Sequence, residues 1–327
     1  VLIFLIPKYG VDPLMGCLIE IGFEGGHGAA AIMGDSLLKL GFPEGLDLGL
    51  AMATVGLLSS TLIGSLLVVL ARWRGWLILD ENEESTILGS DEQSNEIFSQ
   101  VKEILTNLAL TGCAVLFGVL SLILITSFAP YFDGIFNDVL KSFPVFPLAL
   151  LGSLMVRLIL EKTDNTNIVS PLIQREIGTL STDLLIITAM ASLNLPLLVN
   201  DWLPITVLSI TGLTWNLAGM FFFAKLTFKK EWFERSIAEF GNATGVAASG
   251  ILLLRLSDPK NSTNTLPIFS IKQLLLQPLL SGGIITVTAP LVVRQFGLKG
   301  WTELSGLLTI IFISLIFILS SQRLNND

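Results

Sequence analysis

Residues 13–40 read PLMGCLIEIGFEGGHGAAAIMGDSLLKL, and this stretch decides what kind of fold the chain can adopt. It is mostly apolar over about ten residues on either side of the run Gly25-Gly26-His27-Gly28, and ten helical residues cross only about half a bilayer. Residues 231–254 repeat the pattern around Gly241-Asn242-Ala243-Thr244-Gly245. Each stretch predicts two half-helices joined by a tip, a re-entrant hairpin that enters and leaves the membrane on one side. The alternative for each stretch is a single kinked helix that spans the membrane.

The composition is that of a membrane protein. The chain has 327 residues, of which 52% are hydrophobic and 14% are charged, and its mean hydropathy is +0.74. Soluble domains carry about 25% charged residues, so this chain has too few charges to cover a surface in water. With a net charge of −8 and no Lys/Arg-rich groove, it is not expected to be a soluble enzyme, a nucleic-acid-binding protein or a disordered scaffold. We therefore expect an all-α polytopic membrane protein whose partners include the lipid bilayer and no nucleic acid.

The few cysteines and histidines limit the chemistry further. Cys17 and Cys113 both lie in apolar stretches, so neither a disulfide framework nor a cysteine metal site is expected. His27 is the single histidine, which excludes a multi-histidine metal centre within one chain. Neither HExxH nor GxSxG occurs, and we expect no enzyme.

Seven further stretches have the length of a membrane span, about 20 mostly apolar residues, or come close to it. They are residues 48–71, 104–132, 142–160, 177–199, 202–224, 273–293 and 304–322. Five of them separate the two glycine-rich stretches, and a hairpin does not change sides, so the two hairpins must enter from opposite faces.

This order predicts inverted repeats, each with three spans, a hairpin and two spans. Residues 1–132 then hold the C-terminal part of the first repeat, and residues 142–322 hold the second repeat. We expect three more spans ahead of Val1, so that the chain is truncated at its N-terminus.

The basic residues indicate the orientation in the membrane. In this topology, 14 of the 19 Lys and Arg residues lie on one side of the membrane, and this excess predicts that the C-terminus is cytoplasmic. Residues 80–100 contain seven acids and no base, and we expect a flexible acidic cytoplasmic linker there.

The backbone of such a tip suits small ions. The half-helix that leaves the tip begins with free N–H groups and a partial positive charge, which suit a carboxylate. The half-helix that enters it ends in free carbonyls, which suit Na⁺. We therefore expect the substrate to bind the glycines and polar side chains of both tips. These residues are Gly25, Gly26, His27, Gly28, Asn242, Thr244 and Gly245.

Acids inside apolar segments are candidates for a cation site because they are costly there. The Na⁺ candidates are Glu24, Asp183 and the backbone of Gly241. Asp183 alternatively caps or pairs within its own helix. Arg255 either pairs with a substrate carboxylate or only marks the cytoplasmic end of its half-helix, and His27 is alternatively a structural hydrogen-bond partner.

Several of these motifs resemble one known family. The run GFEGGHGAAA at 22–31 resembles the GGHG-type tip of the glutamate:sodium symporter family, and AMATVG at 51–56 resembles the family's next helix. Weaker likenesses are TDLLIITAM at 182–190 and AEFGNATGVAASG at 238–250, the latter similar to the second tip of a divergent branch. Ala29 replaces the hydroxyl residue that commonly follows GGHG in the family.

The resemblance implies a homodimeric, elevator-type secondary transporter in the cell membrane, whose core domain moves against a dimerising scaffold. It implies Na⁺-coupled uptake of glutamate or a related small carboxylate, with Na⁺ as coupling ion and no organic cofactor. Two alternatives stay open, which are transport of a different organic anion by the same fold, and an ion channel whose half-helices meet at the midplane.

Overall fold

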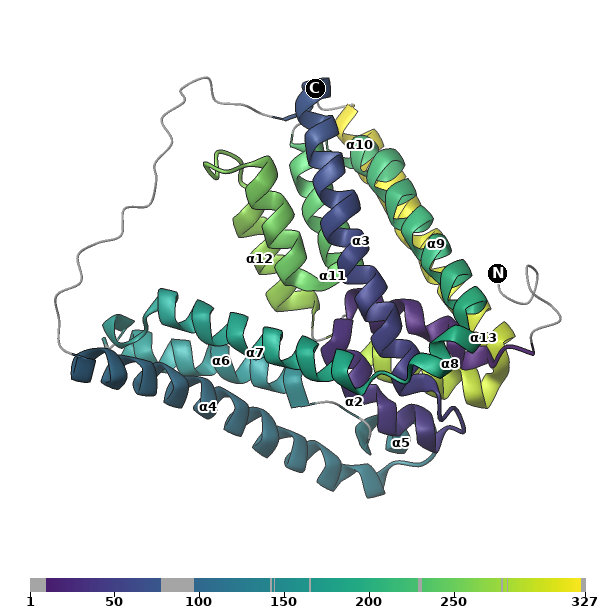
Figure 1. Cartoon of the computed structure of the whole chain (residues 1–327), viewed down its shortest axis with the longest axis horizontal. Coiled ribbons are helices and arrows are strands. Elements are labelled where there is room, and N and C mark those ends of the chain that lie inside the picture. The colour runs from purple at the N-terminus through teal and green to yellow at the C-terminus, as the bar shows by residue number, and fades with distance from the viewer. Residues whose placement is uncertain are drawn as a thin grey trace. The chain divides into compact units, whose positions relative to one another are not determined.

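The computed structural model describes residues 10–77, 97–141, 143, 145–164, 166–228, 231–277, 279–280 and 282–324. Every regular element in these residues is a helix, as Figure 1 shows. Five of the helices are long and apolar enough to cross a membrane, so the prediction of an all-α polytopic membrane protein is confirmed. They are Gly45–Arg74, Val101–Tyr131, Trp202–Thr227, Trp232–Ser257 and Ile284–Ile318.

The chain divides into two compact units. The first unit comprises Val1–Leu79 and Ala189–Asp327, and the second comprises Asp80–Thr188. The elements of the first unit are η2 (Pro13–Cys17), η3 (Glu20–Glu24), α2 (Gly26–Lys39), α3 (Gly45–Arg74), α8 (Leu195–Asn200), α9 (Trp202–Ala218), η6 (Gly219–Phe223), α10 (Ala224–Thr227), α11 (Trp232–Ser257), α12 (Thr265–Leu276) and α13 (Ile284–Leu324). Those of the second unit are α4 (Ile97–Phe128), η4 (Ala129–Tyr131), α5 (Ile135–Lys141), α6 (Val145–Lys162), η5 (Thr166–Ile168) and α7 (Pro171–Ser192), whose last turn belongs to the first unit.

The first glycine-rich stretch folds back on itself. Its helical elements η2, η3 and α2 are here called the first broken segment, because the chain bends at Gly26, where φ is +65°. The guanidinium group of Arg294 contacts both ends of the segment. It lies 3.5 Å from the Asp12 carboxylate and donates to the carbonyl of Leu40 at 2.5 Å and to that of Gly41 at 3.1 Å. The entry and the exit of this segment therefore lie side by side.

The second glycine-rich stretch, α11, also reverses direction. Its backbone leaves the helical region at Gly245 and Val246, with φ/ψ of −148°/36° and 66°/170°. A Cβ on Gly241 would lie 2.6 Å from the Cα of Gly250. In one straight helix, residues nine apart are about 13 Å apart along the axis. The two halves of α11, here called the second broken segment, therefore run antiparallel.

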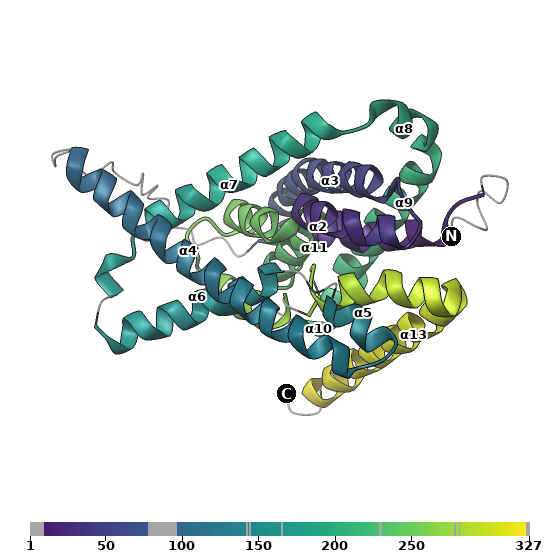
Figure 2. The same ribbon diagram turned by 90° about the horizontal axis from the view of Figure 1, so that it is seen from below.

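Helix α3 lies against both broken segments, and the three are neighbours in Figures 1 and 2. The first broken segment follows the N-terminal half of α3. A Cβ on Gly45 would lie 2.8 Å from Leu37, near the end of α2, and a Cβ on Gly56 would lie 2.8 Å from the ring of Phe23, beside the tip. The tip of this segment thus reaches the middle of α3, and its base lies at the start of α3.

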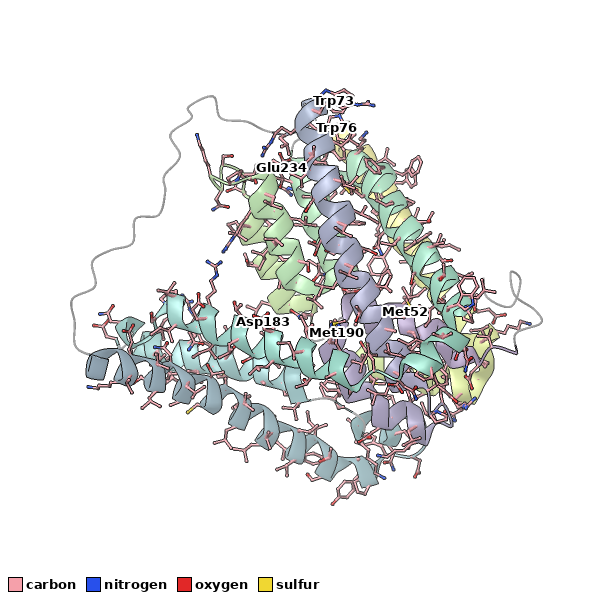
Figure 3. The ribbon with its side chains drawn as sticks, in the orientation of Figure 1. Met52, Trp73, Trp76, Asp183, Met190 and Glu234 are labelled. Carbon is pink, nitrogen blue, oxygen red and sulfur yellow. The ribbon has the colours of Figure 1, made fainter. Side chains whose placement is uncertain are left out.

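The second broken segment follows the C-terminal half of α3. Its base lies at the end of α3, where Trp76 and Phe233 have ring centroids 6.1 Å apart, and Figure 3 marks Trp76 close to Glu234 in the first turn of α11. Its tip reaches the same middle turn, because a Cβ on Gly56 would lie 2.3 Å from the carbonyl oxygen of Thr244. The two broken segments therefore approach one another from opposite ends of α3.

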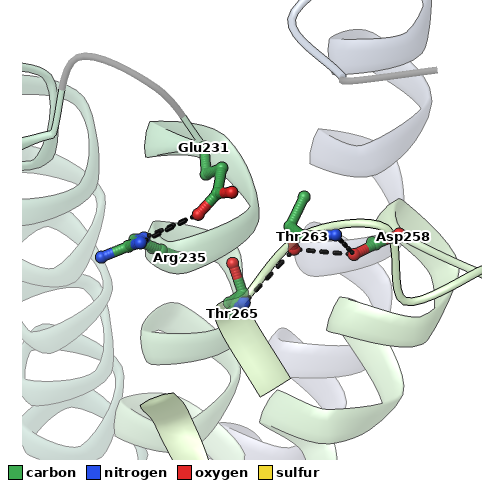
Figure 4. A network of polar contacts seen from close by, with 5 residues as sticks. All are labelled: Glu231, Arg235, Asp258, Thr263 and Thr265. Carbon is green, nitrogen blue, oxygen red and sulfur yellow. Dashed lines mark hydrogen bonds and ion pairs between the residues drawn. The ribbon is translucent and has the colours of Figure 1, made fainter. Parts of the chain in front are cut away.

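A buried aspartate holds the base of the second broken segment. Asp258, which follows α11, accepts hydrogen bonds from the backbone and hydroxyl groups of Ser262, both at 2.8 Å. Its other oxygen accepts from Thr263 N at 2.9 Å and from Thr263 Oγ1 at 2.7 Å, as Figure 4 shows. The i,i+4 ion pair between Arg235 and Glu231 lies at the start of α11 in the same view.

Two predicted spans are interrupted and are corrected here. Residues 177–199 are not one helix, because α7 ends at Ser192 and the side chain of Asn194 caps α8 by accepting from Leu197 N at 3.3 Å. Residues 273–293 are divided between α12 and α13, with the sequence QPLLSGG between them at 277–283. A charge-free apolar stretch measures only length and hydropathy, whereas proline and glycine in a sequence also disfavour a continuous helix.

The other predicted spans correspond to helices with different bounds. Residues 48–71 lie within α3, residues 104–132 lie mostly within α4, and residues 142–160 correspond to the shorter α6. Residues 202–224 are helical as α9, η6 and the start of α10, and residues 304–322 lie within α13, which is broken at Gly297, where φ is +77°. Of the predicted acidic linker, residues 80–96 lie outside the described residues and 97–100 begin α4.

The second unit is centred on the contact between α4 and α6. A Cβ on Gly118 would lie 2.6 Å from the backbone nitrogen of Ala149, and a Cβ on Gly152 would lie 2.4 Å from the carbonyl of Ala114. Small residues permit such close approach of membrane helices. A cavity of about 410 Å³ lies beside this contact, and none of the predicted site residues lines it. Its lining residues are Leu110, Thr111, Ala114, Ser153, Val156, Arg157, Leu160, Val169, Pro171 and Gln174.

Candidate functional site

The tips of the two broken segments touch one another. A Cβ on Gly26 would lie 2.4 Å from Cγ1 of Val246, so only glycine leaves room for this contact. Gly26 also needs its φ of +65°, which L-residues with a side chain adopt at a cost. On the other side of the contact, Val246 has φ +66° and ψ 170°, a region that costs a β-branched residue on the order of 1–3 kcal/mol. Strain of this kind persists only where the surrounding packing imposes it.

The first tip presents the N-terminus of α2. The helix begins at Gly26, so the amides of Gly26, His27 and Gly28 are those for which helix geometry provides no intrahelical acceptor. Gly25 precedes them as the N-cap, in a helical conformation. Because the N-terminus of a helix carries a partial positive charge, this end suits a carboxylate.

His27 is buried and its tautomer follows from its partner. Its Nε2 lies 3.1 Å from the hydroxyl oxygen of Thr54 on α3. The Thr54 hydroxyl has one hydrogen, which it donates to the carbonyl of Leu50 at 2.9 Å. Nε2 must therefore carry the hydrogen of the His27 contact, and Nδ1 remains available as an acceptor in the neutral ring.

The second tip gathers oxygen atoms from α11 and α3. The hydroxyl of Ser60 donates to the carbonyl of Gly241 at 3.4 Å, and a Cβ on Gly245 would lie 3.0 Å from the Ser60 oxygen. The hydroxyl of Ser249 donates to the carbonyl of Gly245, and that of Thr244 donates to the carbonyl of Phe240 at 2.6 Å. Buried hydroxyl and carbonyl oxygens are the ligands that transporters use for Na⁺.

A polar network joins the two tips. The side chain of Asn242 is hydrogen-bonded to the carboxylate of Glu24 at the end of η3. The carbonyl oxygen of Asn242 accepts from Gln273 Nε2 of α12 at 2.5 Å. The next residue on α12, Lys272, is ion-paired with Glu239 of α11. Glu24 therefore connects the first tip to α11 and α12.

Most of the sequence-predicted residues are brought together here. Those of the first tip, from Glu24 to Gly28, and those of the second tip, from Gly241 to Gly245, lie on opposite sides of one contact beside the middle of α3. Within the described residues, no three His, Cys, Asp or Glu side chains converge as a site for a transition metal requires.

Two predicted residues are outside this group of contacts. Arg255 is exposed in the last turn of α11, ten residues after Gly245 and thus about 15 Å along the helix from the tip. Asp183 is an exposed residue in the middle of α7, in the second unit, as Figure 3 marks. The structure of the first unit therefore brings neither of them to the tips.

Sequence reasoning missed four polar residues near the tips. Ser60, Gln273 and Thr286 lie in apolar stretches whose pattern predicts only spans, and their partners are far away along the chain. Glu20 carried a usable signal, because it is an acid within an apolar half-helix. Its carboxyl group lies within hydrogen-bond distance of the hydroxyl of Thr286.

Comparison with known families decides the class of the protein. The family model of the sodium/glutamate symporters matches residues 4–230. The chain belongs to the sodium/glutamate symporter family. It is therefore a multi-pass membrane transporter of a sodium-coupled family rather than a member of an enzyme family. Comparison with curated protein sequences and with solved structures gives no match.

The family match includes the first broken segment and ends just before the second. The GGHG run thus falls within the matched residues, whereas α11, α12 and α13 lie outside them and are connected to this run only by contacts in the structure. The contact of Gly26 with Val246 and the network from Glu24 to Gln273 make that connection.

Proposed function

We propose that the protein is a sodium-coupled symporter that takes up glutamate or a related small carboxylate through a site between the two tips. One observation carries the proposal, which is the meeting of two broken segments beside the middle of α3. Helix α3 is long enough to span a bilayer, so its middle lies near the bilayer midplane. Substrate and ion sites of secondary transporters lie at such broken helices.

The substrate carboxylate would bind the N-terminus of α2. The amides of Gly26, His27 and Gly28 supply hydrogen-bond donors, and the second tip supplies Asn242 and Thr244 from the other side. This arrangement favours an anion, and the family favours glutamate among the anions. A different small organic anion is the second candidate substrate.

Sodium is cargo in this proposal, and its ligands would be oxygens. The carbonyls of Gly241 and Gly245 and the hydroxyls of Ser60 and Ser249 form the buried oxygen group of the second tip. Glu24 is the candidate that would link this ion to the substrate, because it contacts Asn242. Coupling then requires only that Na⁺ and substrate each raise the affinity for the other.

The two units suggest a division of labour. Both broken segments belong to the first unit, which we propose as the moving core of an elevator-type transporter. The second unit, with its close α4–α6 contact, would be the scaffold and would form the homodimer. We further propose a location in the cell membrane with a cytoplasmic C-terminus, as the distribution of Lys and Arg favours.

Uptake by the full chain in sealed proteoliposomes tests the proposal. Radiolabelled glutamate should accumulate when an inward Na⁺ gradient is imposed and should not when K⁺ replaces Na⁺. Unlabelled dicarboxylates added in excess report the substrate, since the preferred anion competes best. A channel would give a flux that does not saturate with substrate. Absence of Na⁺-driven accumulation for glutamate and for every competing anion would refute the proposal.

A further inference from the structure

A second polar contact lies behind the first tip, between η3 and the start of α13. The side chain of Glu20 meets that of Thr286 in the first turn of α13, directly after the break that separates α12 from α13. Thr286 is fully buried. None of the sequence-predicted binding residues takes part in this contact.

The single hydroxyl hydrogen of Thr286 faces two oxygen atoms that could accept it. The hydroxyl oxygen of Thr286 lies within hydrogen-bond distance of a Glu20 carboxyl oxygen and is 3.0 Å from the carbonyl oxygen of Leu280. Both partners are acceptors when Glu20 is ionised, and a threonine hydroxyl has only one hydrogen to donate. If Glu20 is ionised, one of these two oxygen–oxygen contacts therefore has no hydrogen between its atoms. A protonated Glu20 carboxyl group supplies the missing hydrogen.

The surroundings also disfavour a bare carboxylate. The second carboxyl oxygen, Oε2, is buried without a hydrogen-bond partner. The backbone N–H of Gly282 faces the carboxyl group, but a single N–H does not replace the hydration of a carboxylate. An uncompensated buried charge of this kind is strongly unfavourable.

The neighbouring cations are engaged elsewhere. On the same segment, Glu24 and Cys17 are the titratable groups that interact with Glu20. Lys272 of α12 pairs with Glu239 of α11, and Arg294 of α13 pairs with Asp12. From α2, His27 faces Thr54 of α3 instead. Among the described residues, none of these basic groups forms an ion pair with Glu20.

We infer that Glu20 is a proton-binding site. The carboxylic acid donates its hydrogen from Oε1 to the Thr286 hydroxyl, and the hydroxyl donates its own to the Leu280 carbonyl, so that each contact has one hydrogen. On release, the O–H bond of the acid breaks and the proton passes to water. The Thr286 hydroxyl then rotates and donates its hydrogen to the Glu20 carboxylate, and its hydrogen bond to the Leu280 carbonyl is lost.

The consequence for transport rests on the proposed function. The protonated relay ties the first broken segment to the break before α13, so proton loss loosens the structure behind the substrate tip. Uptake should then decline as pH rises through the titration of Glu20, with a slope of up to about tenfold per pH unit for one proton.

Infrared difference spectroscopy of the full chain in lipid tests the site without any need for transport. The difference between the spectra of the wild type and of Glu20→Gln should contain the carbonyl stretch of one protonated carboxylic acid, and this band should disappear as pH rises. The control Glu303→Gln, which changes an exposed glutamate of α13, should retain the band. Thr286→Val keeps the acid but removes its acceptor, so the band should shift, whereas Thr286→Ser should leave it in place.

Each arm can overturn the inference. Titrating carboxylic-acid bands that are identical in the wild type and in Glu20→Gln would show that Glu20 holds no proton. Loss of the band when Na⁺ replaces K⁺ at constant pH would assign the site to Na⁺ instead. If proteoliposomes show no uptake but the band behaves as expected, the proton site stands and only the proposed function fails.

Discussion

At the residue scale, the proposed site depends most directly on Gly26. A side chain here would adopt an unfavourable φ and would collide with Val246, so Gly26→Ala should displace the tip. Loss of a few buried hydrogen bonds of about 1–3 kcal/mol each is enough for a roughly 10- to 100-fold loss of apparent substrate affinity. Na⁺-driven uptake in proteoliposomes measures it.

Two variants make this prediction specific. Gly16→Ala is the matched control, because a Cβ there meets nothing within 4 Å. Val246→Ala removes the atom that the new methyl group would strike, so it should partly restore affinity in combination with Gly26→Ala. An unchanged apparent affinity in Gly26→Ala would mean that the tip is only a packing kink.

The contact between His27 and Thr54 gives a second prediction at this scale. Thr54→Val removes the acceptor of the His27 Nε2 hydrogen and leaves a buried donor unsatisfied, which costs about 1–3 kcal/mol. Thr54→Ser retains the hydroxyl and should behave like the wild type. The two variants should differ both in their thermal unfolding temperature in detergent and in their apparent affinity for substrate. Equal values for Val and Ser at this position would show that the contact contributes nothing.

Individual residues also show which parts of the proposed site can be predicted from the sequence and which cannot. The glycines of the first tip could be predicted because glycine, histidine and acid coincide within one apolar stretch. The turn of the second tip lies at Gly245–Val246, at the end of the predicted run rather than at its centre. No local rule places a β-branched residue at positive φ, and the contact with Gly26 accounts for that position only once the fold is known.

At the scale of elements, the junction between α11 and α12 depends on Asp258. Burial raises the pKa of Asp258, but the hydrogen bonds from Thr263 and Ser262 outweigh it and hold the pKa below the ordinary value. A lowered folded-state pKa stabilises the fold above the unfolded pKa of about 3.9. That stability is lost as pH falls below this value and through the folded pKa.

Asp258→Asn should therefore lower the unfolding temperature at neutral pH and reduce the further loss in acid. The expected cost is about 1–3 kcal/mol, because the amide cannot accept all four hydrogen bonds. Asp133→Asn, at an exposed aspartate, is the matched control. A pH profile of unfolding that is the same for Asp258→Asn and the wild type would contradict this role.

The helices show a similar limit to prediction. Apolar length identified α3, α4 and α9, because these helices contain no strong breaker in their interiors. The same criterion failed for residues 273–293, because this stretch is apolar throughout but is divided between two helices. That break places Thr286 and Gln273 against the two broken segments, and contacts across 266 and 31 residues of sequence leave no periodic signal in a single chain.

At the scale of the whole molecule, the decisive question is from which face each broken segment enters the membrane. Within the first unit the two segments lie along opposite halves of α3 and have their bases at its opposite ends. If α3 spans the bilayer, the bases must open to opposite sides. Kinked spans would instead bring the two ends of one segment to different sides, which is incompatible with both ends of the first segment contacting Arg294.

Single cysteines introduced at exposed residues test this topology in sealed, oriented vesicles. The exposed Cys113 is first replaced by serine, whereas Cys17 is buried and can stay. Pro13→Cys and Lys39→Cys flank the first segment, and both should react with an impermeant thiol reagent from the same face. Lys260→Cys, beside the end of the second segment, should react only from the other face. Labelling of Pro13→Cys and Lys39→Cys from opposite faces would make the first segment a span, and the site between two tips would lose its basis.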